Sequence, residues 1–228
     1  NGPPFIRLAG NNAVISGFVI TYPEWKQSDV PPAPYPPCVL CEGKENVKVS
    51  DCLLLNPYEG IKMIGAARHW IRNVTGYPIK RGIFVDECYD IGHIENVHFW
   101  PFGVNYKPDD PFCKWVNTQG IAFELSRTDW QYVFNTFCFG YNVGYKFIQT
   151  KAGVCNGNFL GLGADDCFTA VVVEHNLDLI AHADHVIANT GSLTDLKAAT
   201  LALALPARAR LSSAPTWSRS VRIRSTST

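Results

Sequence analysis

A short motif recurs about every 22 residues and limits how this chain can fold. Residues 49–54 (VSDCLL), 71–74 (IRNV) and 94–99 (IENVHF) each open on a branched apolar residue, and each has Asp or Asn two places later. The openings Val49, Ile71 and Ile94 are 22 and 23 residues apart. Sequence repeats of this length are typical of one recurring supersecondary unit.

A second marker follows each opening. This marker is the start of a short segment in which side chains alternate between inward and outward positions. It occurs at Gly60-Ile61, Gly82-Ile83, Gly120-Ile121 and Gly144-Tyr145. Each unit therefore has two short strands separated by turn residues, without an amphipathic helix between them. Parallel strands usually require a helical crossover, so a coil of strands and turns is the best remaining arrangement. The pattern predicts an all-β solenoid.

The Asp or Asn at the turn, the Gly-Ile strand opening and their spacing resemble the pectate-lyase-like superfamily over residues 11–174. The resemblance implies a right-handed parallel β-helix, here of about six or seven coils. Members of the superfamily include pectate and alginate lyases, polygalacturonases, other glycoside hydrolases and phage tailspikes. The resemblance thus implies a polysaccharide partner and a secreted or cell-surface location.

The repeat pattern predicts one β-helix domain over residues 1–190. Residues 191–228 are rich in Ala, Leu, Ser and Arg and form a tail, expected to be disordered or to include a capping helix at 194–205. A basic arm that binds nucleic acid is the rival interpretation. The first residues, Asn-Gly-Pro-Pro, are not a signal peptide, so we expect a chain cut from a longer protein or a mature end.

The formal net charge of zero argues against nucleic acid or an anionic membrane as the main partner. No apolar run reaches the length of a membrane-spanning segment. The eight cysteines favour a buried stack, with Cys52 in an apolar slot of the repeat. Cys38 and Cys41 would point to opposite faces of a strand, so we expect no metal site there. Disulfides and an oligomeric state are left open.

Aligning the Gly-Ile strands predicts a column of outward carboxylates. Asp86 and Glu124 fall at the same place on consecutive units, and Glu42 is in the same column. Neighbouring strands lie about 4.8 Å apart, close to the separation of about 5 to 5.5 Å between the carboxyl groups of retaining glycosidases. The alignment predicts Asp86 and Glu124 as the catalytic pair of a glycoside hydrolase, without a cofactor.

There are two insertions, residues 21–37 and 101–119. They lie immediately before the Gly-Ile strand of the first and of the fourth repeat, and they would form walls on either side of the column. They would bring Tyr22, Trp25 and Trp115 over it. Aromatic faces beside carboxylates suit a carbohydrate chain, with Lys62 and Lys146 also on the binding surface. Ordinary solvated surface pairs are the alternative interpretation.

Two other activities fit the same residues. In a calcium-dependent polysaccharide lyase, Asp86 and Glu124 would hold calcium, and Lys62, Arg81 or Lys146 would be the base. In a carbohydrate-binding or tailspike-type adhesin module, the groove would bind without cleavage. Asp165-Asp166 resembles the paired aspartates of polygalacturonases.

Overall fold

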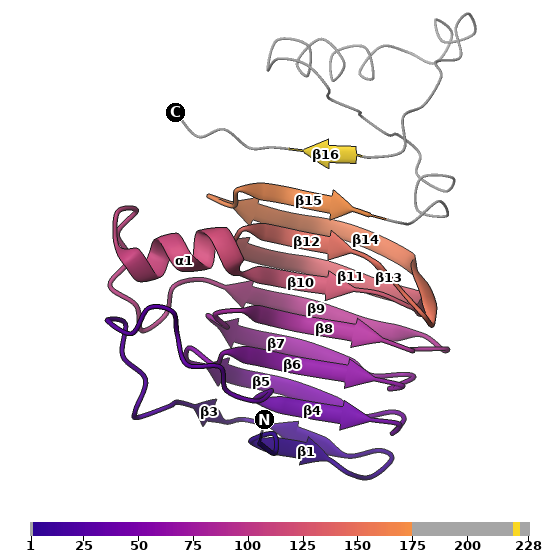
Figure 1. Ribbon diagram of the computed structural model, residues 1–228. Coiled ribbons are helices and arrows are strands. Elements are labelled where there is room, and N and C mark those ends of the chain that lie inside the picture. The colour runs from indigo at the N-terminus through magenta and orange to yellow at the C-terminus, as the bar shows by residue number, and fades with distance from the viewer. Residues whose placement is uncertain (1, 175–220, 224–228) are drawn as a thin grey trace, which may run out of the picture.

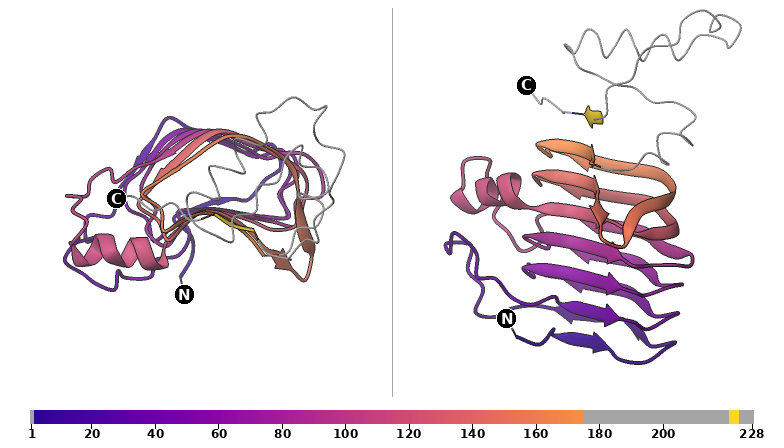
Figure 2. Two further views of the ribbon diagram at one scale, coloured as in Figure 1. Left: turned by 90° about the horizontal axis from the view of Figure 1, so that it is seen from above. Right: turned by 45° about the vertical axis from the view of Figure 1, so that its right-hand side comes forward.

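The computed structural model describes residues 2–174 and 221–223. These residues form two mostly parallel β-sheets, with the hydrophobic core between them (Figure 1). From β4 to β12, successive strands alternate between the two sheets, so each short repeat of the sequence contributes one strand to each sheet. Seen from above, the strands of successive repeats superpose (Figure 2).

The first sheet is parallel except at β16, which pairs antiparallel with β15. Its strands, in spatial order, are β1 (Ile6–Leu8), β4 (Val39–Glu42), β6 (Glu59–Ile64), β8 (Arg81–Asp86), β10 (Ile121–Leu125), β12 (Val143–Phe147), β15 (Thr169–Val173) and β16 (Val221–Ile223).

The second sheet is parallel except at β13, which pairs antiparallel with β14. Its strands, in spatial order, are β13 (Gln149–Thr150), β14 (Gly153–Asp165), β11 (Thr128–Phe139), β9 (Gly92–Phe99), β7 (Trp70–Gly76), β5 (Lys48–Leu54) and β2 (Val14–Ser16), with β3 (Val19–Ile20) also paired to β5.

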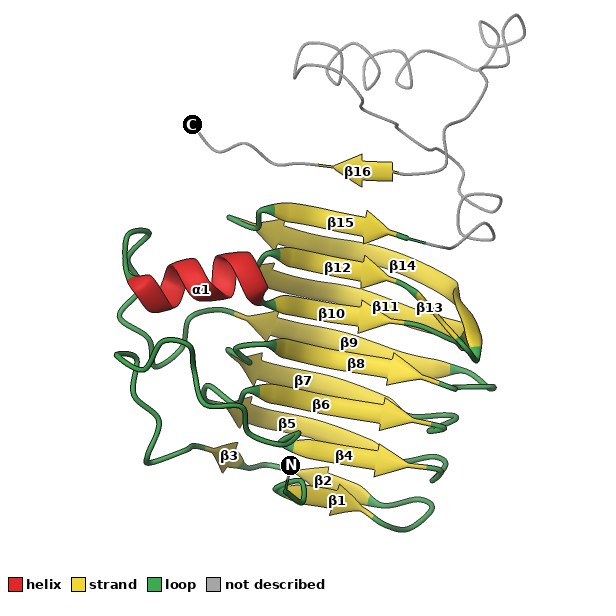
Figure 3. Cartoon of the chain, viewed as in Figure 1, coloured by secondary structure: helices red, strands yellow, loops and turns green. Residues whose placement is uncertain are grey.

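One helix, α1 (Pro111–Gln119), lies between β9 and β10 (Figure 3). The Asp110 carboxylate caps it by accepting hydrogen bonds from two backbone N–H groups of the first turn, and Pro111 fits the first helical position. The helix buries Phe112 and Val116, which are one helical turn apart. These features explain a helix within residues 101–119, a segment for which the repeat pattern predicted an insertion and no helix.

The structure corrects the predicted fold class. The prediction of an all-β, right-handed parallel β-helix of about six or seven coils is wrong, because the described residues form two mostly parallel sheets with a single small helix. That helix interrupts the chain between β9 and β10, and antiparallel pairs occur at β13–β14 and β15–β16. Of the predicted tail, 191–228, only Val221–Ile223 belongs to the described residues, and the predicted capping helix lies outside them.

The strand register follows the repeat in part. Ile61 pairs with Ile83, as the alignment of the Gly-Ile markers predicted. Ile83 then pairs with Phe123 and not with Ile121, a slip of two residues. The slip arises where α1 ends, because the N–H of Gly120 still bonds to Val116 of the helix and the strand begins only afterwards.

The Asp and Asn of the repeat form a ladder of side-chain hydrogen bonds. Asn73 donates to Asp51 at 2.8 Å, Asn96 donates to Asn73 at 2.8 Å, and Asn135 donates to Asn96 at 3.3 Å. All four residues have φ between 50° and 56°, a left-handed conformation that Asn and Asp tolerate better than most residues. The Asp and Asn of the motif thus have a structural role, because they link consecutive repeats.

The core joins the two sheets through aromatic contacts. Phe99 of β9 stacks on Phe123 of β10 with centroids 5.2 Å apart, and Phe123 stacks on Tyr145 of β12 at 4.8 Å. All three side chains are buried. The predicted core slot is also confirmed for Cys52, which is buried and pairs with Val74.

His69 is a buried base in this core. Its Nδ1 lies 2.7 Å from the carbonyl oxygen of Ala66, while its Nε2 is buried without a hydrogen-bond partner. Burial lowers the pKa of His69 from 6.5 to about 4. The imidazole is therefore neutral in the folded protein at pH 7.

We expect the protein to lose stability as the pH falls from 6.5 to about 4, because His69 takes up a proton over this range only in the unfolded chain. The free energy of unfolding should fall by about 3 kcal/mol from this residue. Urea denaturation at several pH values would measure it, with His69→Gln as the non-titrating control. An equal pH dependence in that variant would contradict the assignment.

In the described part of the chain, no helix has the length and apolar character needed to cross a membrane.

Candidate functional site

The register does not bring Asp86 and Glu124 side by side. Glu124 pairs with Phe84 on β8 and with Lys146 on β12, whereas Asp86 lies two residues further along β8. This offset corresponds to about 6.6 Å along a strand, in addition to the spacing between strands. The predicted approach of the two carboxylates at the spacing between adjacent strands is therefore wrong.

Asp86 connects the segments that follow strands β8, β10 and β12. Its Oδ1 accepts hydrogen bonds from the backbone N–H of Glu87 at 2.9 Å, from that of Arg127 at 3.1 Å and from the Thr150 hydroxyl at 3.1 Å. The residue is 8% exposed. These contacts explain a buried carboxylate at this position, since each satisfies part of its hydrogen-bonding capacity.

Glu124 belongs to a ladder of alternating charges on the outer face of the first sheet, which we call the charge ladder: Glu59, Arg81, Glu124, Lys146 and Glu174. Arg81 contacts Glu124 at 3.1 Å and Glu59 at 3.4 Å. Lys146 contacts Glu174 at 2.9 Å and Glu124 at 3.8 Å. Strands β6, β8, β10 and β12 of the first sheet each contribute one residue to the ladder, and Glu174 directly follows β15.

Aromatic side chains border the ladder. The Arg81 guanidinium lies 4.7 Å from the Phe84 ring centroid, and the Lys62 ammonium lies 6.0 Å from the same ring. Next to Arg81 in the sequence, Lys80 has its ammonium 5.8 Å from the ring centroid of Trp115 in α1. Trp115 in turn lies 6.2 Å from Tyr58. Three predicted binding residues, Lys62, Lys146 and Trp115, thus border or belong to this face.

The two insertions pack against each other and do not form two walls. Gln27 and Asn105 exchange two hydrogen bonds of 3.0 Å, one in each direction. Trp25 packs edge-on against Phe112 of α1, with centroids 5.3 Å apart. The predicted placement of Trp25 over the carboxylates is therefore wrong, because its ring is used to join the insertions.

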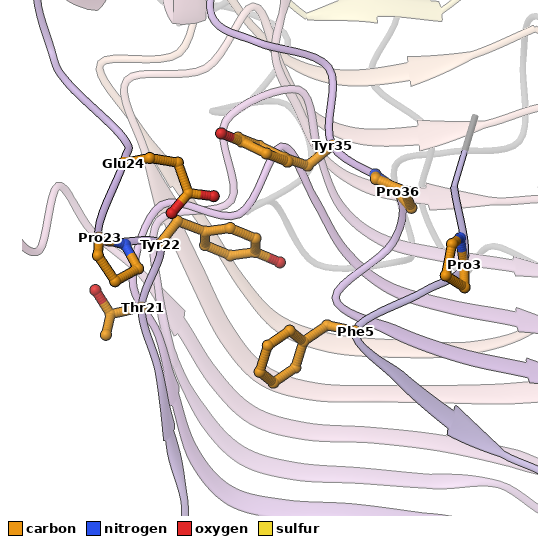
Figure 4. Close-up of a pocket in the computed structure, with 8 residues that line it drawn as sticks. All are labelled: Pro3, Phe5, Thr21, Tyr22, Pro23, Glu24, Tyr35 and Pro36. Atoms are coloured by element: carbon orange, nitrogen blue, oxygen red, sulfur yellow. The ribbon is translucent and has the colours of Figure 1, made fainter.

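A hollow of about 280 Å³, which we call the tyrosine hollow, lies where the N-terminal segment meets the first insertion (Figure 4). The rings of Phe5, Tyr22 and Tyr35 surround it, with Glu24 at one side. Tyr22 lies 5.1 Å from Tyr35 and 6.4 Å from Phe5, measured between centroids. The remaining lining residues are Pro3, Thr21, Pro23 and Pro36.

A second hollow of about 300 Å³ shares Tyr35 and Pro36 with the tyrosine hollow. Tyr58 and Glu59 also line it, and Glu59 is the first member of the charge ladder. The two hollows therefore adjoin each other at Tyr35, and the second hollow adjoins the charge ladder at Glu59. The other lining residues are Gly2, Pro34 and Pro37.

The phenol groups of the tyrosine hollow stay protonated at neutral pH. Burial raises the pKa of Tyr22, and the neighbouring Cys38 raises it further. Burial, the negative charge of Glu24 and a hydrogen bond to that carboxylate raise the pKa of Tyr35. A protonated hydroxyl can donate and accept hydrogen bonds. The Tyr22 hydroxyl is buried, so the Tyr35 hydroxyl is the one that a ligand can reach.

Of the predicted site residues, Glu124 and Lys146 are in the ladder and Tyr22 is in the tyrosine hollow. Glu42 lies elsewhere on the sheet, in an exposed ion pair with Arg7 at 2.6 Å. Four residues that line the hollows were not predicted as site residues from the sequence: Phe5, Glu24, Tyr35 and Tyr58. Of these four residues, only Tyr35 had a local sequence signal. It lies between Pro34 and Pro36, in a segment that the prolines make stiff.

Asp166 occupies a turn after β14. Its side chain accepts a hydrogen bond of 2.5 Å from the Tyr106 hydroxyl, and its carbonyl oxygen accepts one of 3.0 Å from the Asn117 side chain. Both partners come from the second insertion, so Asp166 anchors that segment. Among the described residues, no three His, Cys, Asp or Glu side chains form a group suited to a metal ion.

Comparisons with protein-family models, with curated proteins and with solved structures find no match to this chain.

Proposed function

We propose that this protein binds a carbohydrate chain across the two hollows and the adjoining charge ladder, and that it does so without cleaving the chain. The observation that carries the proposal is the pair of small hollows that share Tyr35. Ligand pockets range from about 300 to 1,000 Å³, so each hollow has room for one small ring. Two adjacent ring sites are suited to consecutive units of an oligosaccharide.

The lining of the hollows supports this choice of ligand. Tyrosine rings offer apolar faces to the C–H groups of a sugar, and the Tyr35 hydroxyl can hydrogen-bond to its hydroxyls. Glu24 and Glu59 lie beside these rings and can accept hydrogen bonds from sugar hydroxyls. Prolines complete the walls and restrict the backbone, which lowers the entropic cost of binding.

The contacts of the Asp86 and Glu124 carboxylates favour binding of the carbohydrate without cleavage. Asp86 is engaged in three hydrogen bonds, and Glu124 is paired with Arg81 and Lys146. Hydrolysis by these two residues and calcium-dependent elimination remain predictions that the same experiment tests. A polysaccharide partner also agrees with the expected location in the secreted fraction or at the cell surface.

Replacing Tyr35 by alanine should weaken carbohydrate binding at least tenfold, about 1.4 kcal/mol, because Tyr35 lines both hollows. The parent would first be screened on a panel of plant, algal and bacterial polysaccharides and oligosaccharides. Calorimetry would then measure the affinity of parent and variant for the best ligand. Glu24→Gln should weaken binding less, since the amide still accepts hydrogen bonds.

Tyr89→Ala is the matched control, because Tyr89 is an exposed tyrosine outside both hollows. Its affinity should stay within about twofold of the parent. Equal affinities for the Tyr35→Ala variant and the parent, or failure of every carbohydrate to bind, would overturn the proposed site. New reducing ends or ultraviolet absorbance from unsaturated sugars would show that the protein cleaves its ligand.

A further inference from the structure

Two buried cysteines face each other near the last described strands of the two sheets. Cys138 lies on β11, and Cys167 lies in the turn between β14 and β15. Their Sγ atoms are 3.9 Å apart, and the residues are 0% and 2% exposed. None of the eight cysteines, all of which are in the described part of the chain, forms a disulfide in this structure.

We propose that Cys138 and Cys167 form a disulfide when the protein is exposed to a peroxide. The sulfur atoms would have to approach from 3.9 Å to about 2.05 Å. Rotation of two short side chains and a small shift of the turn after β14 can supply this movement. The bond would connect β11 to the segment that follows its neighbouring strand β14, and so fasten consecutive repeats to each other.

The surroundings of the pair assign different roles to the two thiols. A hydrogen bond from Cys138 lowers the pKa of Cys167, and backbone contacts near Gly140 and Tyr141 act in the same direction. Burial raises the pKa of Cys138. Because Cys167 also lies in a turn, whereas Cys138 lies on a strand paired on both sides, we assign Cys167 as the attacking sulfur, with the thiolate as the nucleophilic form.

The turn that contains Cys167 also has an exposed residue next to this cysteine. Phe168, the next residue, is 54% exposed, and Asp166, the preceding one, is half-buried. A molecule as small as hydrogen peroxide needs only a local opening of this turn to reach the sulfur. Cys138 sits behind it on a strand paired on both sides, in position to act second.

The reaction consumes one peroxide and gives two water molecules. The Cys167 sulfur attacks one peroxide oxygen, the O–O bond breaks, and water leaves, so that Cys167 becomes a sulfenic acid. The Cys138 sulfur then attacks the Cys167 sulfur and the S–O bond breaks. The thiol proton of Cys138 leaves with the hydroxyl group as the second water.

Peptide mapping of the full-length protein tests the bond directly. Reduced protein would be treated with hydrogen peroxide, denatured in iodoacetamide and digested without reductant. Trypsin cuts after Lys146 and Lys151 and separates the two cysteines, and chymotrypsin cuts after Phe159 and separates Cys167 from Cys155. We expect a cross-linked peptide pair that contains Cys138 and Cys167. Alkylated Cys138 together with alkylated or sulfinic Cys167 would overturn the proposal.

Thermal unfolding gives a second readout. The bond would close a loop between residues 29 positions apart, so peroxide should raise the melting temperature by roughly 5–10 °C. Cys138→Ser should abolish this rise, whereas Cys52→Ser, another buried cysteine, should keep it. If Cys138→Ser does not fold, the peptide mapping of the parent protein still tests whether the disulfide forms. A rise that persists in Cys138→Ser would contradict the assignment.

Discussion

Replacing Phe123 by alanine is expected to lower the free energy of unfolding by about 3–5 kcal/mol. The ring lies between Phe99 at 5.2 Å and Tyr145 at 4.8 Å, so its removal opens a cavity between the two sheets. Because Phe99 and Phe123 belong to different sheets, the same change also removes a contact that holds the sheets together. Urea denaturation of parent and variant would measure the difference.

Phe5→Ala provides the matched control, because Phe5 is 64% exposed and its truncation creates no cavity in the core. Its free energy of unfolding should stay within about 0.5 kcal/mol of the parent. The free energy of unfolding of Phe123→Leu should lie between those of Phe123→Ala and Phe5→Ala. A loss below about 1 kcal/mol for Phe123→Ala would mean that the aromatic stack contributes little to the association of the sheets.

Replacing Asn73 by valine is expected to lower the free energy of unfolding by about 2–4 kcal/mol, from backbone strain and lost hydrogen bonds. Asn73 has φ of 54°, a left-handed conformation that is strongly unfavourable for a β-branched residue. Its side chain also donates to Asp51 and accepts from Asn96. Urea denaturation would again give the difference.

Asn73→Gly separates these two causes. Glycine tolerates a positive φ but makes no side-chain hydrogen bonds, so we expect a loss of about 1–2 kcal/mol. Arg72→Ala is the positional control on the adjacent, exposed residue. Equal losses for Asn73→Val and Asn73→Gly would show that the hydrogen-bond ladder, and not the backbone conformation, determines the preference for Asn here.

Much of the local structure was predictable from the repeat. Strands pair in register at Ile61 and Ile83, and Cys52 lies in the core opposite Val74. These results follow from local chemistry, because alternation assigns a side chain to one face of a strand and Asn tolerates a left-handed turn. The resemblance to the pectate-lyase-like superfamily and the polysaccharide partner that it implies stay predictions.

The predicted fold class and the predicted spacing of Asp86 and Glu124 failed at the same segment. Residues 101–119 contain a helix whose signal is short, an Asp110-Pro111 start followed by Phe112 and Val116. The end of this helix, and not the Gly-Ile marker, sets where β10 begins. A slip of two residues was enough to separate Glu124 from Asp86, because register determines which side chains become neighbours.

The order of strands and turns, the buried slots and the left-handed Asp and Asn positions follow from the residues alone, because each depends on neighbours close in sequence. The arrangement of the helix and the two sheets, the charge ladder and the hollows around Tyr35 depend on tertiary packing. Phe5, Tyr22 and Tyr35 meet only because the N-terminal segment packs against the first insertion. Contacts between segments so far apart depend on the complete packed chain, and no local pattern encodes them.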